Sequence, residues 1–419
     1  MTALIFLQHV NRVLGILFMV CYFYQFLYIP VALAIRRKKN PPAKKLHRYA
    51  VLISARNEEA VIGQLLDSIA RQDYPADLVT TFVVADNCTD STAQVARDAG
   101  AVVFERFNKL RVGKGYALDF LLDQIKEQYG AEWFDGYFVF DADNLLQRDY
   151  ITRMNEVFDQ GCAIVTSYRN SKNYGDNWIS AGYALWFLRD AAFLNAPRAQ
   201  LGISCVVAGT GFLFSGEIMR RCGGWPFHTL TEDTEFTVHN ILQGEKIGYC
   251  GAAEIFDEQP TRLSQSWRQR LRWAKGYLQV LRKDGGRLAA GIFSKNGPSC
   301  FDMLMSILPA MVLTFCSVLF GSAATVLQLI LGKNILPILV AFAASFAVPY
   351  LLLLLVGIIT TATQWHSIRA TAFKKVLYTF TFPLFMLTYI PISIAAIFSP
   401  KVEWKPIEHK VAVSISEMK

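Results

Sequence analysis

Two carboxylates one residue apart follow a short apolar run in the middle of the chain. The run Gly136–Phe140 predicts a buried strand, and Asp141 and Asp143 come directly after it. Ligands of open α/β sheets bind beyond the carboxyl ends of the strands. Two adjacent carboxylates repel each other unless a cation lies beside them, and Mg²⁺ or Mn²⁺ accepts one or two carboxylates together with phosphate oxygens. We therefore expect Asp141 and Asp143 to hold a divalent metal and a diphosphate. The alternative is a solvated turn that caps the next helix.

Polar residues also follow the other predicted strands of this region. Apolar runs at 49–55 and 81–85 predict buried strands, and Glu58 and Asp86 come after them. Helical periodicity lies between the strands, so the two elements alternate as in the βαβ units of a mostly parallel sheet. A nucleotide bound here would meet side chains at successive strand ends.

Two common nucleotide-binding fingerprints are missing from the sequence. No Gly-x-Gly-x-x-Gly follows the first strand, and Gly113-Lys114-Gly115 lacks both the upstream glycine and the following Ser or Thr of a phosphate-binding loop. A nucleotide would therefore have to be held by side chains. Lys114, at the head of a predicted helix, could offer its charge to a diphosphate; the alternative is an ordinary surface lysine.

Two segments farther along could contact an acceptor molecule. The stretch 177–199 is rich in Trp, Tyr and Phe, which fits either a core helix or a helix at a membrane interface beside an acceptor. After it, Gly209-Thr210-Gly211 interrupts the pattern and indicates a close approach of the backbone to a neighbour. An acceptor sugar is one candidate for that neighbour.

Two charged clusters complete the set of candidate residues. Thr231-Glu232-Asp233-Thr234-Glu235 precedes a predicted helix and carries more acids than a helix cap needs. Gln269-Arg270-Leu271-Arg272-Trp273 lies on a basic helix predicted over 265–282. Such a helix could lie on anionic lipid, or its arginine could hold a diphosphate while the tryptophan stacks on a sugar ring.

Four long apolar runs distinguish the chain from an ordinary soluble enzyme. The 419 residues are 53% hydrophobic, and about 20 apolar residues suffice for a helix that crosses a bilayer. The predicted spans are Val13–Ile35, Pro309–Leu331, Ile335–Ala362 and Val376–Phe398. One globular domain is predicted between the first two.

Basic residues set the expected orientation. They crowd the exit of the first span, which by the positive-inside rule is cytoplasmic: Arg36, Arg37, Lys38, Lys39, Lys44, Lys45 and Arg48. We therefore expect an integral protein of a bacterial-type plasma membrane whose globular domain is cytoplasmic.

Composition restricts the partners. The eight cysteines have no paired spacing, which argues against a zinc site or a disulfide framework and suits a reducing compartment. The net charge of +8 is concentrated near the predicted spans, so membrane lipid is the expected anionic partner. No nucleic acid is expected, because no aromatic and basic signature accompanies the charge.

The ordered motifs resemble those of the family 2 membrane glycosyltransferases, which include cellulose, chitin, hyaluronan and poly-N-acetylglucosamine synthases. The motifs are Asp86, Asp141-Ala142-Asp143, Thr231-Glu232-Asp233 and Gln269-Arg270-Leu271-Arg272-Trp273, with spans on both flanks. The resemblance covers about residues 49–282 and implies an α/β fold of GT-A type, with a mostly parallel sheet in a cytosolic domain flanked by transmembrane and interfacial helices. Two positions depart from the family pattern: Asn87 follows Asp86 where a second acid is usual, and Asp119 stands where the family has asparagine.

The resemblance implies a role for each candidate residue. Glu58 and Asp86 would contact the uridine of a UDP-sugar, Lys114 the uracil or diphosphate, and Arg272 the diphosphate. Asp141 and Asp143 would bind both the donor and Mg²⁺ or Mn²⁺. Asp233 would be the general base, with Glu232 beside it. The expected acceptor-binding residues are Gly209, Thr210, Gln269 and Trp273.

The predicted organisation has six parts. They are an N-terminal transmembrane helix (1–35), a basic linker (36–48), the catalytic domain (49–260), interfacial helices with the Gln-Arg-Leu-Arg-Trp motif (261–300), three transmembrane helices (301–398) and a tail (399–419). Three later crossings would leave the tail outside, yet Trp404–His409 is similar to a segment that some relatives place over the cytosolic site. Either one apolar run does not cross, or the tail has another role.

The predicted function is inverting transfer from a UDP-sugar, with UDP-N-acetylglucosamine or UDP-glucose as donor, to a growing β-linked polysaccharide. One alternative is a transferase that adds a single sugar to a lipid-linked acceptor. A more distant alternative is a membrane-anchored scaffold or transporter without enzymatic activity.

Overall fold

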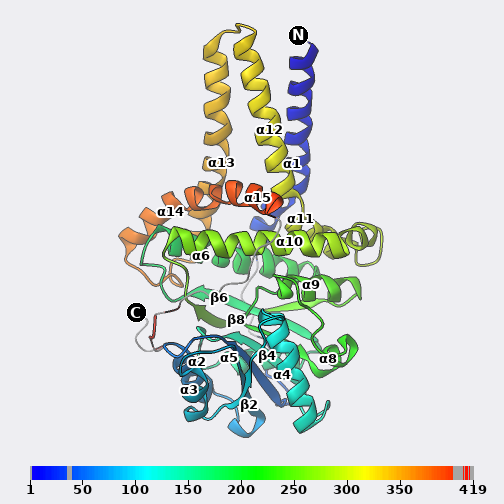
Figure 1. Cartoon of the computed structure of the whole chain (residues 1–419), viewed down its shortest axis with the longest axis vertical. Coiled ribbons are helices and arrows are strands. Elements are labelled where there is room, and N and C mark those ends of the chain that lie inside the picture. The colour runs from blue at the N-terminus through cyan, green and yellow to red at the C-terminus, as the bar shows by residue number, and fades with distance from the viewer. Residues whose placement is uncertain (1, 35–39, 400–408, 410, 414, 416–419) are drawn as a thin grey trace.

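An eight-stranded mixed sheet forms the centre of the lower part of the molecule (Figure 1). The computed structural model describes residues 2–34, 40–399, 409, 411–413 and 415. The spatial strand order is β3-β2-β1-β4-β7-β6-β8-β5. The strands are β1 (Tyr49–Ala55), β2 (Val79–Asp86), β3 (Val102–Arg106), β4 (Gly136–Asp141), β5 (Leu145–Leu146), β6 (Ile164–Ser171), β7 (Phe212–Ser215) and β8 (Ile247–Asp257). The predicted strands at 49–55 and 81–85 are confirmed, the second being two residues longer at its start and one at its end.

The direction of the strands brings their functional ends to one edge of the sheet. β1 pairs in parallel with β2 and β4, so Ser54 lies opposite Asp141 and Ala55 opposite Ala85. β7 runs antiparallel to both β4 and β6, and β6 pairs in parallel with β8. The carboxyl ends of β1, β2, β4, β6 and β8 therefore face the same way, as does the start of β7.

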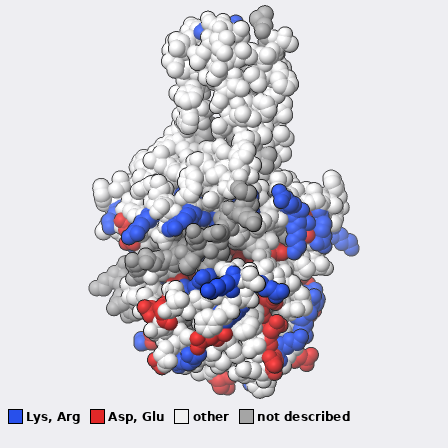
Figure 2. Space-filling model, viewed as in Figure 1, with Lys and Arg blue, Asp and Glu red and all other residues white. Residues whose placement is uncertain are grey.

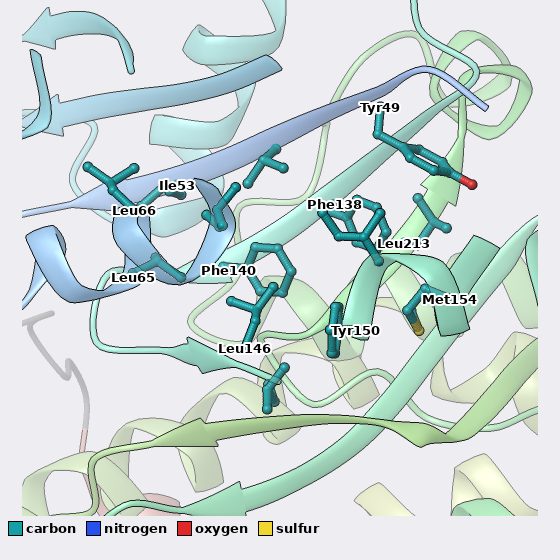
Figure 3. Close-up of a cluster of buried hydrophobic side chains, with 14 of the residues drawn as sticks. Tyr49, Ile53, Leu65, Leu66, Phe138, Phe140, Leu146, Tyr150, Met154 and Leu213 are labelled. Atoms are coloured by element: carbon teal, nitrogen blue, oxygen red, sulfur yellow. The ribbon is translucent and has the colours of Figure 1, made fainter. Parts of the chain in front are cut away.

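Helices cover both faces of the sheet because successive strand side chains point to opposite sides. Tyr49, Val51 and Ile53 pack on one face with α2 (Ile62–Ala70) and α5 (Tyr150–Phe158), and this cluster is shown in Figure 3. Ala50 and Leu52 pack on the other face with α4 (Lys114–Tyr129). Smaller helices complete the domain: α3 (Thr92–Asp98), α7 (Ala196–Gln200), α8 (Gly216–Cys222), α9 (Glu232–Leu242) and the turn η1 (Ala76–Leu78).

Three helices stand upright on this domain in Figure 1, namely α1 (Thr2–Ala34), α12 (Pro309–Ile330) and α13 (Ile335–Thr363). Among the described residues, α1, α13 and the segment Ala372–Phe398 are long and apolar enough to cross a membrane. α12 has 22 residues, which makes it about 33 Å long, close to the thickness of a bilayer core. Figure 2 shows few charged residues along the upright column and basic patches at its foot.

The last apolar run differs from the single helix expected at Val376–Phe398. It forms α14 (Ala372–Leu387) and α15 (Tyr389–Phe398), which meet at Thr388 and lie across the foot of the upright helices (Figure 1). Arg270 Nη1 donates to Phe385 O (3.1 Å) and Thr388 Oγ1 (2.8 Å), and so holds this junction. The arrangement favours the alternative in which one apolar run does not cross the membrane.

Two long helices join the catalytic part to the membrane part. α6 (Trp178–Arg189), continued by a π-helical turn at Asp190–Asn195, begins at a capping box on Asn177 and packs against α14 so closely that a Cβ on Gly182 would lie 2.3 Å from Phe385. α10 (Leu263–Gly291) runs beneath the upright helices and packs on α9, α11 (Gly297–Ile307) and α15. The aromatic stretch at 177–199 therefore forms a buried helix that also faces the membrane part.

A buried ion pair fixes the first upright helix to the domain. Arg198 Nε donates to Asp302 Oδ2 (2.6 Å), and Tyr28 Oη of α1 donates to Asp302 Oδ1 (3.3 Å). The basic residues expected at 36–39 and the segment 404–408 lie outside the described residues.

Candidate active site

The two carboxylates after β4 are held in place by the backbone around them. The Asp141 N–H donates to Asn144 Oδ1 (3.1 Å) and to Thr210 Oγ1 (2.9 Å). Asp143 is buried, and its Oδ2 accepts from the Glu258 N–H after β8 (2.8 Å). Asp141 and Asp143 thus lie where the ends of β4 and β8 meet the loop before β7.

Lys114 joins the carboxylate loop to the glycine loop. Its Nζ forms an ion pair with Asp141 and donates to Gly209 O (2.7 Å). The position follows from the start of α4, which begins at Lys114 on the same edge of the sheet. Lys114 is therefore an internal contact of the site, and the alternative of an ordinary surface lysine is wrong.

The second acidic cluster faces the same space. A Cβ built on Gly209 would lie 3.5 Å from Asp233 Oδ2, so the loop that accepts from Lys114 also borders Asp233. Burial and the Asp233 charge raise the pKa of Glu232 to about 7, against the effect of Lys114 and Arg272. Burial likewise raises the pKa of Asp233, opposed by the Thr234 N–H, Lys114 and Arg272. A carboxylate with a raised pKa can accept a proton near neutral pH.

Positive side chains surround Asp143. Burial acts to raise its pKa, but His409, Lys172, the Glu258 N–H and Arg169 outweigh burial, and the pKa lies below its ordinary value. His409 Nδ1 lies 3.0 Å from both Glu58 carboxylate oxygens. Burial would lower the pKa of His409, but Asp143 and Glu58 raise it to about 10, so the imidazole is protonated at neutral pH.

The end of the chain therefore reaches the catalytic edge. His409 pairs with Glu58 after β1, and the Val411 N–H donates to Glu258 Oε2 (2.8 Å). Of the segment 404–409 that the sequence places over the site, only His409 is among the described residues, and it lies at the site.

The predicted acceptor residues lie along α10 and the glycine loop. Trp273 packs edge-on against Tyr183 and Trp186 of α6, with ring centres 5.9 Å away in each case. Arg272 Nη1 donates to Leu230 O (3.3 Å), just before the acidic cluster. Gln269 Oε1 is buried and has no hydrogen-bond partner among the described residues. Gly211 approaches Ile255 and Ser167 within the protein, so its neighbour is internal.

Asp86, like Asp141 and Glu58, is paired with an internal cation. It is buried at the end of β2, where Arg106 forms an ion pair with it and Asn87 Nδ2 donates to it (3.0 Å). Arg106 in turn donates to Arg111 O (2.7 Å), which holds the loop before Lys114. Asp86 therefore shapes this loop, and its contact with a nucleotide stays a prediction.

Two site residues, Arg169 and Lys172, were missed by sequence reasoning. Arg169 Nε donates to Asp257 Oδ2 (2.8 Å), Arg169 Nη1 donates to Ala208 O (2.8 Å), and the guanidinium lies 3.7 Å from the Phe187 ring centre. Lys172 follows β6 and acts on Asp143. The available signal was a basic residue within a strand, at 169, and another just after it, at 172, but no motif marks them.

The donor atoms at this edge fit a hard divalent cation. Asp141 and Asp143 supply carboxylate oxygens, and one or two carboxylates suffice when phosphate and water complete the shell of Mg²⁺ or Mn²⁺. No group of three or more His, Cys, Asp or Glu suited to a metal occurs in the described part of the chain. Such a metal would therefore depend on the bound diphosphate for its remaining ligands.

A family model supports the resemblance of the motifs. The model described as "Glycosyltransferase like family 2" matches residues 47–276, more than half of the chain. The match begins just before β1 and ends within α10, so it contains every predicted site residue.

Relatives and solved structures agree with this match. A beta-monoglucosyldiacylglycerol synthase of Synechocystis is 28% identical over 239 residues, which cover 55% of this chain and 47% of that protein. A poly-beta-1,6-N-acetyl-D-glucosamine synthase of Staphylococcus epidermidis is 23% identical over 235 residues, 56% of this chain and 55% of that protein. The chain thus spans about half the length of the curated relatives it matches.

The fold is shared with a mannosyltransferase from Pyrobaculum calidifontis solved with GDP-Man and Mn²⁺. The TM-score is 0.59 at 17% identity, covering 94% of this chain and 100% of that one. The predicted GT-A type fold is therefore confirmed.

We expect Asp143→Asn to weaken Mn²⁺ binding in the presence of UDP by at least about tenfold, the size of effect that even outer partners of a metal site have. Electron paramagnetic resonance of free Mn²⁺ measures this without catalysis. Asp149→Asn is the control, since Asp149 pairs with Arg153 on α5. Equal Mn²⁺ affinity in the Asp143 variant and the wild type would remove Asp143 from the metal site.

Proposed function

This chain belongs to the family 2 glycosyltransferases, and on that premise we propose that it transfers a sugar from a UDP-sugar, with inversion, to a hydroxyl group at the membrane surface. The observation that carries the proposal is the position of Lys114, which binds Asp141 and Gly209 O and also acts on Glu232 and Asp233. The proposed metal ligand Asp141 and the acidic pair Glu232 and Asp233, which contains the proposed base, thus border one space. Relatives named for glucosyl transfer and N-acetylglucosamine polymers support the donor class.

Each group then has a place in the reaction. The oxygen of the acceptor hydroxyl forms a bond to the anomeric carbon while Asp233 takes the hydroxyl proton. The bond between the anomeric carbon and the diphosphate oxygen breaks, and its electron pair leaves with UDP. Lys114 and Arg272 stabilise the negative charge that develops on the departing diphosphate. A divalent metal held by Asp141 and Asp143 would supply further charge stabilisation when bound. Attack from the face opposite the leaving group gives inversion.

Two acceptors remain for this chemistry. The Gln-Arg-Leu-Arg-Trp motif supports the growing β-linked polysaccharide. Its Trp273, which packs with Tyr183 and Trp186 in the aromatic wall of α6, offers a sugar ring an apolar face. A lipid acceptor that receives one sugar is the second candidate. It is favoured by α13, in which only four of the 29 residues are buried, so this helix encloses little of a path for a polymer.

Asp233→Asn is expected to retain UDP binding and lose transfer, because the amide cannot take the proton. General-base assistance contributes on the order of a hundredfold to ten-thousandfold, so kcat should fall by at least about a hundredfold. UDP release and UDP affinity of the purified protein measure the two quantities. Full activity in the variant would exclude Asp233 as the base.

Glu232→Gln is expected to remove a limb near pH 7 from the pH–rate profile. Burial and the neighbouring Asp233 charge raise the pKa of Glu232 to about 7, so Glu232 loses its proton and adds a second negative charge beside the base as pH rises through that value. A glutamine at this position stays neutral, so the limb near pH 7 should disappear. Glu235→Gln, which changes an acid paired with Lys283, is the control and should leave the limb in place. A limb unmoved by Glu232→Gln would contradict the coupling.

Product size separates the two acceptors. Purified protein supplied with a labelled UDP-sugar should release a ladder of lengthening chains if the acceptor is a polysaccharide. With a lipid acceptor, the label should appear in a single product that carries one sugar and extracts into organic solvent. Chromatography of the products by size and by solubility distinguishes these results.

A further inference from the structure

A basic cavity lies between the catalytic domain and the membrane part. Its volume is about 780 Å³, and it is formed by the loop after β6 and the loop that joins α13 to α14. The charged side chains of its lining are Lys172, Asp176, His366, Arg369, Lys374 and Lys375. The predicted donor and acceptor residues are not among the residues that line it.

The cavity carries an excess of positive charge. Four cationic side chains line it against one carboxylate, Asp176, whose Oδ2 already accepts from Asn173 Nδ2 (3.0 Å). Lys374 Nζ donates to Gly175 O (2.7 Å), which fixes the ammonium at the cavity wall. An ammonium has three donors, so this contact leaves others available. A concave surface of this charge favours an anion, and a phosphate suits lysine in particular.

Lys172 has a buried ammonium at the cavity wall. Its Nζ makes no hydrogen bond to any described residue, and Asp143, Glu258, Asp257 and Glu58 of the catalytic edge lie in its field. A buried ammonium without a hydrogen bond is costly, and a bound oxyanion would remove that cost. Lys172 therefore connects the cavity to the catalytic edge and can donate to an oxyanion there.

The surroundings indicate that the anion belongs to a lipid. α13, a candidate membrane span, ends at Thr363, immediately before the loop that lines the cavity. Along α14, Phe373 is 74% exposed and Val376, Leu377 and Phe380 are 42–51% exposed. These residues recur at helical spacing, so they form one apolar face of α14 that begins beside Lys374, a residue of the cavity lining. Such a face suits acyl chains at a membrane interface.

We propose that this cavity binds the phosphate of an anionic membrane lipid, with its acyl chains on the exposed face of α14. The lipid lies beside the catalytic edge, because Lys172 also acts on the pKa of Asp143 and Glu258 lies in its field. Lys172 is shared with the catalytic edge, so the test measures lipid binding without catalysis.

Calorimetric titration of the full-length protein in a neutral detergent tests the proposal. The probe is dihexanoyl phosphatidylglycerol, compared with dihexanoyl phosphatidylcholine and with glycerol 1-phosphate. We expect phosphatidylglycerol to bind at least about tenfold more tightly than either, because the cavity favours net negative charge and the α14 face favours acyl chains. Glycerol 1-phosphate that binds as tightly as the lipid would overturn the proposal in favour of a soluble phosphate.

Substitutions then locate the site. Lys172→Met with Lys374→Ala should weaken phosphatidylglycerol binding by about tenfold or more. Arg268→Ala with Arg282→Ala removes the same charge from exposed positions of α10 and should change binding by less than about threefold. Asp176→Asn should strengthen binding, a result that misfolding cannot produce. Unchanged affinity in the Lys172 and Lys374 double variant, or equal losses in both double variants, would overturn the proposal.

Discussion

Carboxylates withdrawn from water at one edge of the sheet need positive charge within reach, and much of the structure serves this need. Asp141 forms an ion pair with Lys114 at the start of α4, and Asp86 forms one with Arg106 at the end of β3. Asp257 forms an ion pair with Arg169 of β6. Glu58 receives His409 from the far end of the chain. Each cation comes from a different element, so these ion pairs form only when those elements pack together.

The same charges suit the nucleotide that we propose as the donor. A metal ion would add positive charge and a diphosphate negative charge to an edge where carboxylates are already paired with cationic side chains. Lys114 is central because it holds the Asp141 loop to the glycine loop while its charge opposes the rise in the pKa of Glu232 and Asp233. In the proposed mechanism, the metal-binding carboxylates and the base Asp233 therefore border one space.

The membrane part is fixed to this edge through the motif helix. Arg270 of α10 binds the junction of α14 and α15, while Trp273, one turn further along α10, faces the aromatic wall of α6. One short motif therefore joins the interfacial helices to the acceptor side of the site. α14 and α15 lie across the foot of the column (Figure 1), and His409 lies at the catalytic edge, with its Nδ1 3.0 Å from Glu58 Oε1.

The sequence by itself determined the parallel strands, the family and most of the acids at the sheet edge, because strand ends and local motifs are read within a few residues. Glu58, Asp86, Asp141 and Asp143 all follow short apolar runs that predict buried strands. Arg169 and Lys172 could not be found in this way, since their roles depend on partners 88 and 29 positions away, at Asp257 and Asp143. His409 lies in a segment that only the family resemblance marked, and its partner Glu58 is 351 positions away. The break at Thr388 was equally hidden, because an apolar run has the same composition whether it crosses a membrane or lies along it. Only the tertiary structure decided these points, since electrostatic pairing and helix packing depend on distance in space and not on separation along the chain.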